Sequence, residues 1–133
     1  MAKDIIYPTP EKIIEYNLLA LTLIKVKKAD QPKVLNYHSI VHAIEDCKKL
    51  DGDMYEKAVC LLKELVQRHP FASGNRRTAF IVVKEFLLEN KAVFGVKDDP
   101  SYARVMLGIR ENFYKDEEIN EWIKNGKIKE FKR

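Results

Sequence analysis

The sequence HPFASGNRRTA, residues His69–Ala79, joins two amphipathic segments that both have helical periodicity. The first segment spans Met54–Arg68 and the second spans Asn75–Asn90. A loop that ends where a helix begins directs free backbone N–H groups, and the positive end of the helix dipole, into one small space. Phosphate groups bind well at such a position. We therefore expect an anion-binding loop between these two helices.

Three side chains of this loop suggest its chemistry. Arg77 offers a planar fork of donors that matches phosphate oxygens. Gly74 allows backbone angles that other residues avoid, and it lets a phosphate come close. His69 can exchange a proton near neutral pH, and because it precedes Pro70 we expect it to be extended. A base beside a phosphate site indicates transfer of a phosphoryl or nucleotidyl group to a hydroxyl.

The order of these residues resembles the core motif of the Fic/Doc (Fido) family, H-P-F-x-[D/E]-G-N-[G/K]-R. The matching residues are His69, Pro70, Phe71, Gly74, Asn75 and Arg77, and Thr78 and Ala79 continue the pattern as in the Doc branch. The resemblance is expected to span nearly the whole chain. It implies the all-α Fido fold, ATP as donor, and Mg²⁺ held against the nucleotide phosphates.

The resemblance also assigns roles within the motif. It makes His69 the catalytic base, and Pro70 and Phe71 the residues that pack the loop. The residues expected to bind the nucleotide phosphates are Gly74, Asn75, Arg76 and Arg77. Two of these have open alternatives, since Asn75 could instead cap the helix and Arg76 could simply face solvent.

Two positions depart from the family pattern. Ser73 stands where relatives carry the acidic residue that holds the divalent cation. A hydroxyl is a weaker ligand for magnesium, so Ser73 is expected to hold the metal only loosely. Phe80 stands where Fic adenylyltransferases carry a further arginine. Doc-type proteins also lack that arginine, and its absence is thought to let ATP present its γ-phosphate. Phe80 therefore favours a kinase, whereas Ser73 questions whether the site is active.

The resemblance leads to three hypotheses. The first is a Doc-like toxin of a toxin–antitoxin pair, which transfers the γ-phosphate of ATP to a Ser or Thr hydroxyl of a protein. In Doc relatives that target is a translation elongation factor. The second is an AMP transferase of the Fic type, and the third is a catalytically impaired module that binds anions or proteins. No inhibitory [S/T]-x-x-x-E-[G/N] run occurs in the chain, so control by a separate antitoxin is expected.

The rest of the chain predicts one all-α domain, residues 1–133, built as a compact bundle of about six helices. The first helix is expected from Pro10 to about Lys27, with Thr9 as its cap. Its buried stripe should contain Ile14, Leu18, Leu21 and Ile24. Further helix caps are expected at Ser39, at Asp53, and at Asp98 or Asp99, the last for a helix that reaches Phe113. A final helix, Asp116–Lys124, should bury Trp122.

A short segment before the motif has an alternating pattern. Lys33–Tyr37 could form the extended flap that, in the family, docks the main chain of the target, with Leu35, Asn36 and Tyr37 as its contact residues. A plain linker is the equal alternative. His38 and His42 follow at a spacing that zinc could use, but no third ligand stands out, so we interpret them as surface residues.

Composition limits the remaining classes. Hydrophobic residues make up 46% and charged residues 33%, as in ordinary globular proteins. The net charge of +4 lies partly in the tail Lys127–Arg133, which we interpret as a solvated end, so direct nucleic-acid binding is not expected. Because the longest apolar run, Leu18–Ile24, is too short to span a bilayer and no leader precedes it, we expect a cytoplasmic protein without membrane contact. Cys47 and Cys60 should be free thiols.

Overall fold

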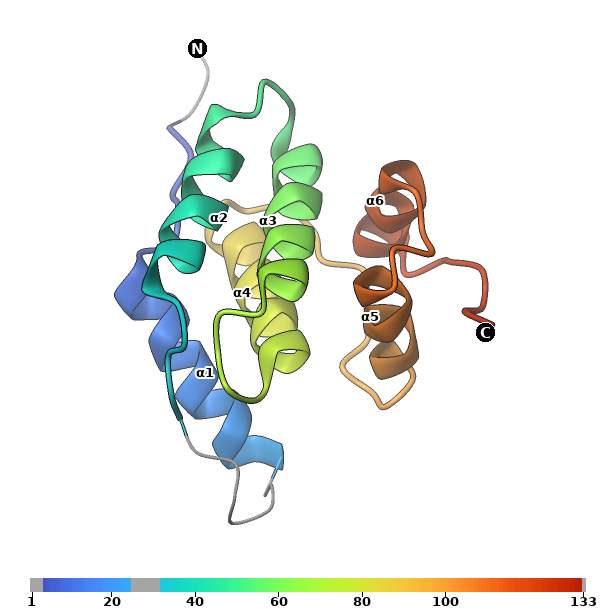
Figure 1. The fold of residues 1–133 in the computed structure, drawn as a ribbon. Coiled ribbons are helices and arrows are strands. Elements are labelled where there is room, and N and C mark those ends of the chain that lie inside the picture. The colour runs from blue at the N-terminus through green and yellow to red at the C-terminus, as the bar shows by residue number, and fades with distance from the viewer. Residues whose placement is uncertain (1–3, 25–31, 133) are drawn as a thin grey trace.

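The computed structural model describes residues 4–24 and 32–132. Within these ranges it contains six helices and no regular strand. The helices are α1 (Pro10–Ile24), α2 (Tyr37–Lys49), α3 (Met54–Arg68), α4 (Asn75–Glu89), α5 (Tyr102–Arg110) and α6 (Asp116–Asn125). In Figure 1, α1 to α4 form one group, and α5 and α6 lie beside it, beyond an extended connector. The prediction of an all-α fold is confirmed.

Helices α3 and α4 form the centre of the molecule. Helix α3 contacts α2, α4, α5 and α6, and it therefore joins the two groups seen in Figure 1. The apolar face of α3 is buried, including Leu61, Leu62 and Leu65, in line with the helical periodicity of this segment. Burial of each such side chain stabilises the fold by about 1.5–3 kcal/mol. Helix α4 is buried on most of its sides, and Trp122 of α6 is also part of the core, as predicted.

Two predicted helix starts are confirmed. Thr9 Oγ1 accepts a hydrogen bond from the N–H of Lys12 over 3.1 Å, at the start of α1. At the start of α3, Asp53 and Glu56 form a capping box, in which each carboxylate accepts a hydrogen bond from the other residue's backbone N–H. These bonds satisfy backbone donors that the first helical turn leaves without a partner.

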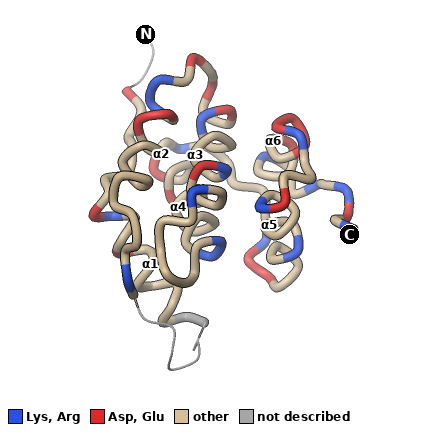
Figure 2. Tube along the Cα trace, in the orientation of Figure 1, with Lys and Arg blue, Asp and Glu red and all other residues tan. Residues whose placement is uncertain are grey.

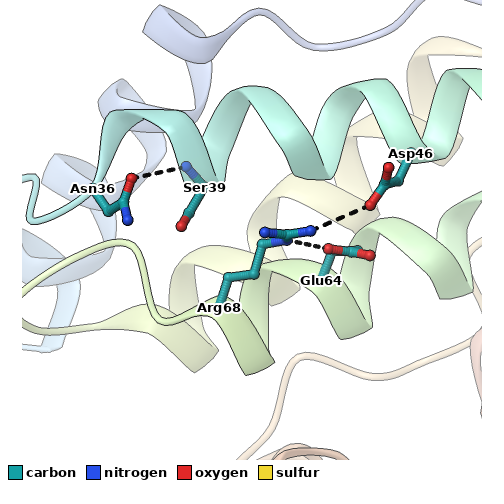
Figure 3. A network of polar contacts seen from close by, with 5 residues as sticks. All are labelled: Asn36, Ser39, Asp46, Glu64 and Arg68. Atoms are coloured by element: carbon teal, nitrogen blue, oxygen red, sulfur yellow. Dashed lines mark hydrogen bonds and ion pairs between the residues drawn. The ribbon is translucent and has the colours of Figure 1, made fainter.

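The cap predicted for α2 was wrong. The helix begins at Tyr37, and Asn36 is its cap, with Asn36 Oδ1 accepting a hydrogen bond from the N–H of Ser39 over 3.1 Å (Figure 3). Asparagine and serine are both good caps, so local preference could not separate the two positions. Figure 3 also shows Arg68 of α3, which forms ion pairs with Glu64 on its own helix and with Asp46 on α2.

The start of α5 also differs from the prediction. Asp99 Oδ1 accepts a hydrogen bond from the N–H of Ser101 over 2.9 Å, so this carboxylate forms a turn before the helix and does not cap it. The helix starts at Tyr102 and ends at Arg110. Phe113 therefore lies beyond it, and its side chain is 36% exposed.

The buried face of α1 is rotated from the predicted stripe. Ile13, Asn17, Ala20 and Leu21 are buried, whereas Leu18 is 48% exposed. Sequence periodicity assigned Leu18 to the core because leucine is apolar, yet the polar Asn17 occupies the buried position. The predicted end of this helix, near Lys27, lies outside the described residues.

The remaining polar features are the charged side chains, two of the histidines and the two cysteines. Lys, Arg, Asp and Glu are interspersed over the helices (Figure 2). His38 and His42 are both exposed on α2, and within the described ranges no group of three potential metal ligands occurs. Cys47 is a buried free thiol whose pKa is raised by burial to about 12, and Cys60 is a partly buried free thiol.

Candidate active site

The loop between α3 and α4 starts with a left-handed residue. His69 has φ of 53° and ψ of 56° and ends α3, so the expected extended conformation was wrong. The following Pro70 disfavours the right-handed helical conformation at His69, and a left-handed residue is the other common way to end a helix. The His69 side chain is exposed and makes no hydrogen bond within the described part of the chain.

Asn75 closes the loop on itself. Its Oδ1 accepts a hydrogen bond from the N–H of Phe71 over 2.9 Å, and its Nδ2 donates to the carbonyl oxygen of Phe71 over 2.8 Å. Both residues are buried. Gly74 occupies the cap position of α4, where no side-chain cap exists, so the helix-cap alternative for Asn75 was wrong. The Asn75 side chain instead fixes the shape of the loop.

The segment before α2 pairs with the motif loop. The carbonyl oxygen of Pro70 accepts hydrogen bonds from the N–H groups of Leu35, over 2.8 Å, and Asn36, over 3.2 Å. Val34 and Phe71 form an isolated antiparallel bridge. Residues 33–36 thus form an edge along the loop, with one bridge at Val34 and a bend at Leu35, which is 56% exposed.

Tyr37 does not belong to that edge. It is the first residue of α2, and its hydroxyl donates a hydrogen bond to Glu11 of α1 over 2.8 Å. Its side chain is 44% exposed. Of the three predicted contact residues, Leu35 and Asn36 therefore lie on the edge, whereas Tyr37 lies at the beginning of the helix that follows.

Asn17 of α1 stabilises the motif loop through hydrogen bonds. The sequence alone did not predict this role. Its Nδ2 donates hydrogen bonds to the carbonyl oxygen of Ser73, over 2.9 Å, and to Thr78 Oγ1, over 3.0 Å. The Asn17 side chain is 2% exposed. A single amide thus joins both sides of the position where the loop becomes α4. The available signal was a polar residue between Ile13 and Leu21, at helical spacing from each.

Gly74 sets the start of α4. Its φ is +77°, a value that residues with side chains rarely adopt, and a Cβ atom built on it would lie 3.1 Å from Leu21 Cδ2. The first helical hydrogen bond runs from the N–H of Thr78 to the carbonyl oxygen of Gly74 over 2.8 Å. The N–H groups of residues 75–77 have no backbone acceptor in the part of the chain that the structure describes. They are the donors that the sequence predicts for an anion.

Arg77 extends from the first turn of α4 towards α5. Its Nη1 donates a hydrogen bond to the hydroxyl of Tyr102 and lies 3.5 Å from Asp98 Oδ1. Its Nε is buried and has no hydrogen-bond partner among the described residues. The guanidinium is therefore only partly satisfied by protein groups.

A sequence model of the Fic/DOC family matches residues 6–87, which is more than half of the chain. The chain belongs to the Fic/DOC family. The matched region contains α1 to α3, the motif loop and nearly all of α4, and it ends before α5 and α6. No curated protein matches the chain.

The residues of the Fic/DOC motif open onto a cavity of about 430 Å³. Its lining includes His69, Ser73 and Gly74 from the loop, Arg76 and Arg77 from α4, and Tyr102, Met106 and Arg110 from α5. Three arginines and one histidine line this cavity, and no carboxylate does. Sequence reasoning found the loop and α4 side of the cavity and missed the α5 side, because residues that far along the chain join the site only through tertiary packing.

A second and larger cavity, of about 860 Å³, lies between α3 and α6. Its lining carries many carboxylates, among them Asp53, Glu56, Glu64 and Asp116. Such a surface repels phosphate, and it contains no residue of the Fic/DOC motif. The smaller, positively charged cavity is therefore the candidate active site.

The residues of that site do not fit a protein-held Mg²⁺. Magnesium binds oxygen ligands, commonly one or two carboxylates. The Ser73 hydroxyl takes the place of the family's acid, and the carboxylate of Asp98 lies against Arg77. The Asn75 amide oxygen is already bonded to the N–H of Phe71. The lining therefore offers arginines where a cation would need carboxylates.

In the described part of this Fic/DOC chain, no helix is both long enough and apolar enough to cross a membrane.

Proposed function

We propose that this chain is a Doc-like toxin of a toxin–antitoxin pair, which transfers the γ-phosphate of ATP to a Ser or Thr hydroxyl of a protein. The observation that carries the proposal is the cavity at the start of α4. There His69 and Arg77 line the same space, and no carboxylate shares it. A base and a phosphate-binding cation in one site are what phosphoryl transfer to a hydroxyl requires.

In this proposal His69 is the general base. Its imidazole has no hydrogen bond to other described residues, so it is free to accept the proton of the attacking hydroxyl. The nucleotide phosphates lie over the N–H groups of residues 75–77, with Arg77 bonding their oxygens. Positioning and charge stabilisation carry the rate, and the chain's own residues form no covalent intermediate.

The choice of the γ-phosphate rests on Phe80. This side chain is 2% exposed and contacts Phe94, Tyr102 and Trp122. It supplies no cation at the position where Fic adenylyltransferases carry an arginine. The absence of that arginine favours a γ-phosphate donor over the AMP donor of the alternative function.

The segment 33–36 is the proposed docking edge for the target's main chain. It already pairs through its backbone with the motif loop, so an added peptide would lie next to the catalytic base. By family resemblance, we propose a translation elongation factor as the target, a separate antitoxin protein as the inhibitor, and the cytoplasm as the location.

Ser73 favours a second candidate, a module that binds anions or proteins without catalysis. The two functions differ in whether label is transferred. We would incubate the protein with γ-labelled ATP and a lysate of its host, using wild type, His69→Ala, and His42→Ala as a control that removes another exposed histidine. The proposal expects a labelled band that His69→Ala weakens by about 10²–10⁴-fold and His42→Ala leaves unchanged. A fully active His69→Ala variant would show that His69 is not the base. If neither the wild type nor any variant transferred label, the binding module would be favoured.

A further inference from the structure

We infer that the cavity neutralises the phosphates of a nucleotide with arginines, without a protein-held divalent cation, and that Arg110 of α5 is one of these arginines. The inference rests on the proposed function only in taking a nucleotide as the ligand. It concerns how that ligand is bound, and it adds a phosphate-binding residue from outside the region that the family model matches.

The first step is the donor set of the cavity. The lining contains Ser73 and three arginines, and none of the lining residues is a carboxylate. A divalent cation in such a site would be repelled by the arginines and held by too few oxygen atoms. An anion in the same site meets positive charge on several sides. The lining therefore favours the phosphates over the metal.

The second step concerns the free capacity of the arginines. Arg76 and Arg110 form no hydrogen bond or ion pair with other residues among 4–24 and 32–132. Arg77 keeps a buried Nε without a partner. Guanidinium groups bind phosphate oxygens through two parallel hydrogen bonds, so each arginine can satisfy part of a polyphosphate chain. Together they provide the positive charge that a metal would otherwise supply.

The third step is the place of Arg110 in the fold. It lies in the last turn of α5, and Tyr102 and Met106 of the same helix line the cavity with it. Helix α4 supplies Arg76 and Arg77, but its Phe80 supplies no cation where Fic adenylyltransferases carry a further arginine. Arg110 thus brings a cation to the cavity from a different helix. A cation at the end of a helix also has a favourable interaction with the helix dipole, so binding and stability have to be measured separately.

The experiment is calorimetric titration with β,γ-imido-ATP, which binds like ATP but does not transfer its γ-phosphate. Each titration is run once in EDTA and once with excess Mg²⁺. For the wild type we expect binding in EDTA, with an affinity within about threefold of that in Mg²⁺. Each charged hydrogen bond to phosphate contributes about 1.5–3 kcal/mol, so we expect Arg110→Gln to weaken binding by about tenfold or more under both conditions.

Two further variants make the test specific. Lys127→Gln removes one positive charge from an exposed residue outside the cavity, and this variant should bind as the wild type does. Ser73→Asp restores the family's acid. It should weaken binding in EDTA through repulsion, and Mg²⁺ should then restore the affinity. Thermal unfolding of every variant shows whether a loss of binding comes from a loss of fold.

The outcomes separate this inference from the proposed function. Binding that needs Mg²⁺ in the wild type, no binding under either condition, or an unchanged Arg110→Gln variant in a folded protein would each overturn the inference. The label assay tests the proposed function independently. Metal-free binding without transfer would leave the inference intact and refute the kinase, whereas transfer with strictly metal-dependent binding would do the reverse.

Discussion

The ring of Phe80 is stacked on the ring of Tyr102, with centroids 4.0 Å apart and 12° between the ring planes. The Tyr102 hydroxyl in turn accepts a hydrogen bond from Arg77. Phe80 therefore affects the motif arginine through packing, by fixing the tyrosine that Arg77 contacts. This stack also joins α4, the last helix of the family match, to α5 beyond it.

Restoring the family's arginine at position 80 should unfold the protein before it changes the reaction. Phe80→Arg would place an unpaired charge among Phe94, Tyr102 and Trp122, and we expect the free energy of unfolding to fall by about 3 kcal/mol or more. Urea denaturation measures this change. Leu88→Arg is the control, because position 88 is on the same helix and 47% exposed. Equal stability of the two variants would contradict the buried position of Phe80.

Removing the amide of Asn17 should weaken both the fold and the site. Asn17→Ala breaks the hydrogen bonds to Ser73 and Thr78, and the buried groups left without a partner should cost about 1–3 kcal/mol. The hydrogen bond to the Ser73 carbonyl also positions the end of the motif loop, just before α4 begins. Without it, the affinity for β,γ-imido-ATP should fall as well. Thr22→Ala is the control, since it removes an exposed hydroxyl bonded only within α1. Unchanged affinity in a folded Asn17→Ala variant would show that Asn17 does not position the loop.

Asp98 should compete with phosphate for Arg77. Its carboxylate lies 3.5 Å from the guanidinium and is about half exposed. Removal of this charge should therefore tighten nucleotide binding only modestly, by about two- to fivefold. Titration of Asp98→Asn with β,γ-imido-ATP measures this gain. Asp99→Asn removes the same charge one residue away, where the carboxylate contacts Ser101. If both variants gained the same affinity, the effect would come from the net charge of the protein and not from the contact between Asp98 and Arg77.

The buried thiol of Cys47 should make stability fall in alkali. Burial raises the pKa of this thiol from 9.0 to about 12, so above pH 9 the unfolded chain loses its thiol proton while the folded chain keeps it. The folded state then binds more protons, and the free energy of unfolding falls as the pH rises from 9 towards 12. Denaturation at several pH values should give a shallower decline for Cys47→Ala than for the wild type. Parallel declines would assign the effect to other groups.

The sequence predicts the features of the fold and of the site that depend on neighbouring residues. The motif, the periodicity of α3 and the caps Thr9 and Asp53 each depend on neighbours within a few residues, and these predictions agree with the structure. The Asn17–Ser73 contact joins residues 56 positions apart. The helical spacing of Asn17 from Ile13 and Leu21 was the available local signal, but the pattern of apolar residues favoured Leu18 instead.

Other features could not be predicted because local preference did not distinguish between alternatives, or because they depend on tertiary packing. Asn36 and Ser39 are both favourable caps, and pairing of residues 33–36 with the motif loop decides where α2 starts. The α5 wall of the cavity, with Tyr102 and Arg110, depends on how α5 packs against α3 and α4. The motif residues by themselves give no information about it.

The most direct test of the central claim is the position of the transferred label. The protein would be incubated with a lysate of its host and with ATP labelled at either the α- or the γ-phosphate, each with EDTA and with Mg²⁺. Our account predicts a discrete labelled protein from γ-labelled ATP alone. Label from α-labelled ATP would mean AMP transfer and would contradict the kinase assignment.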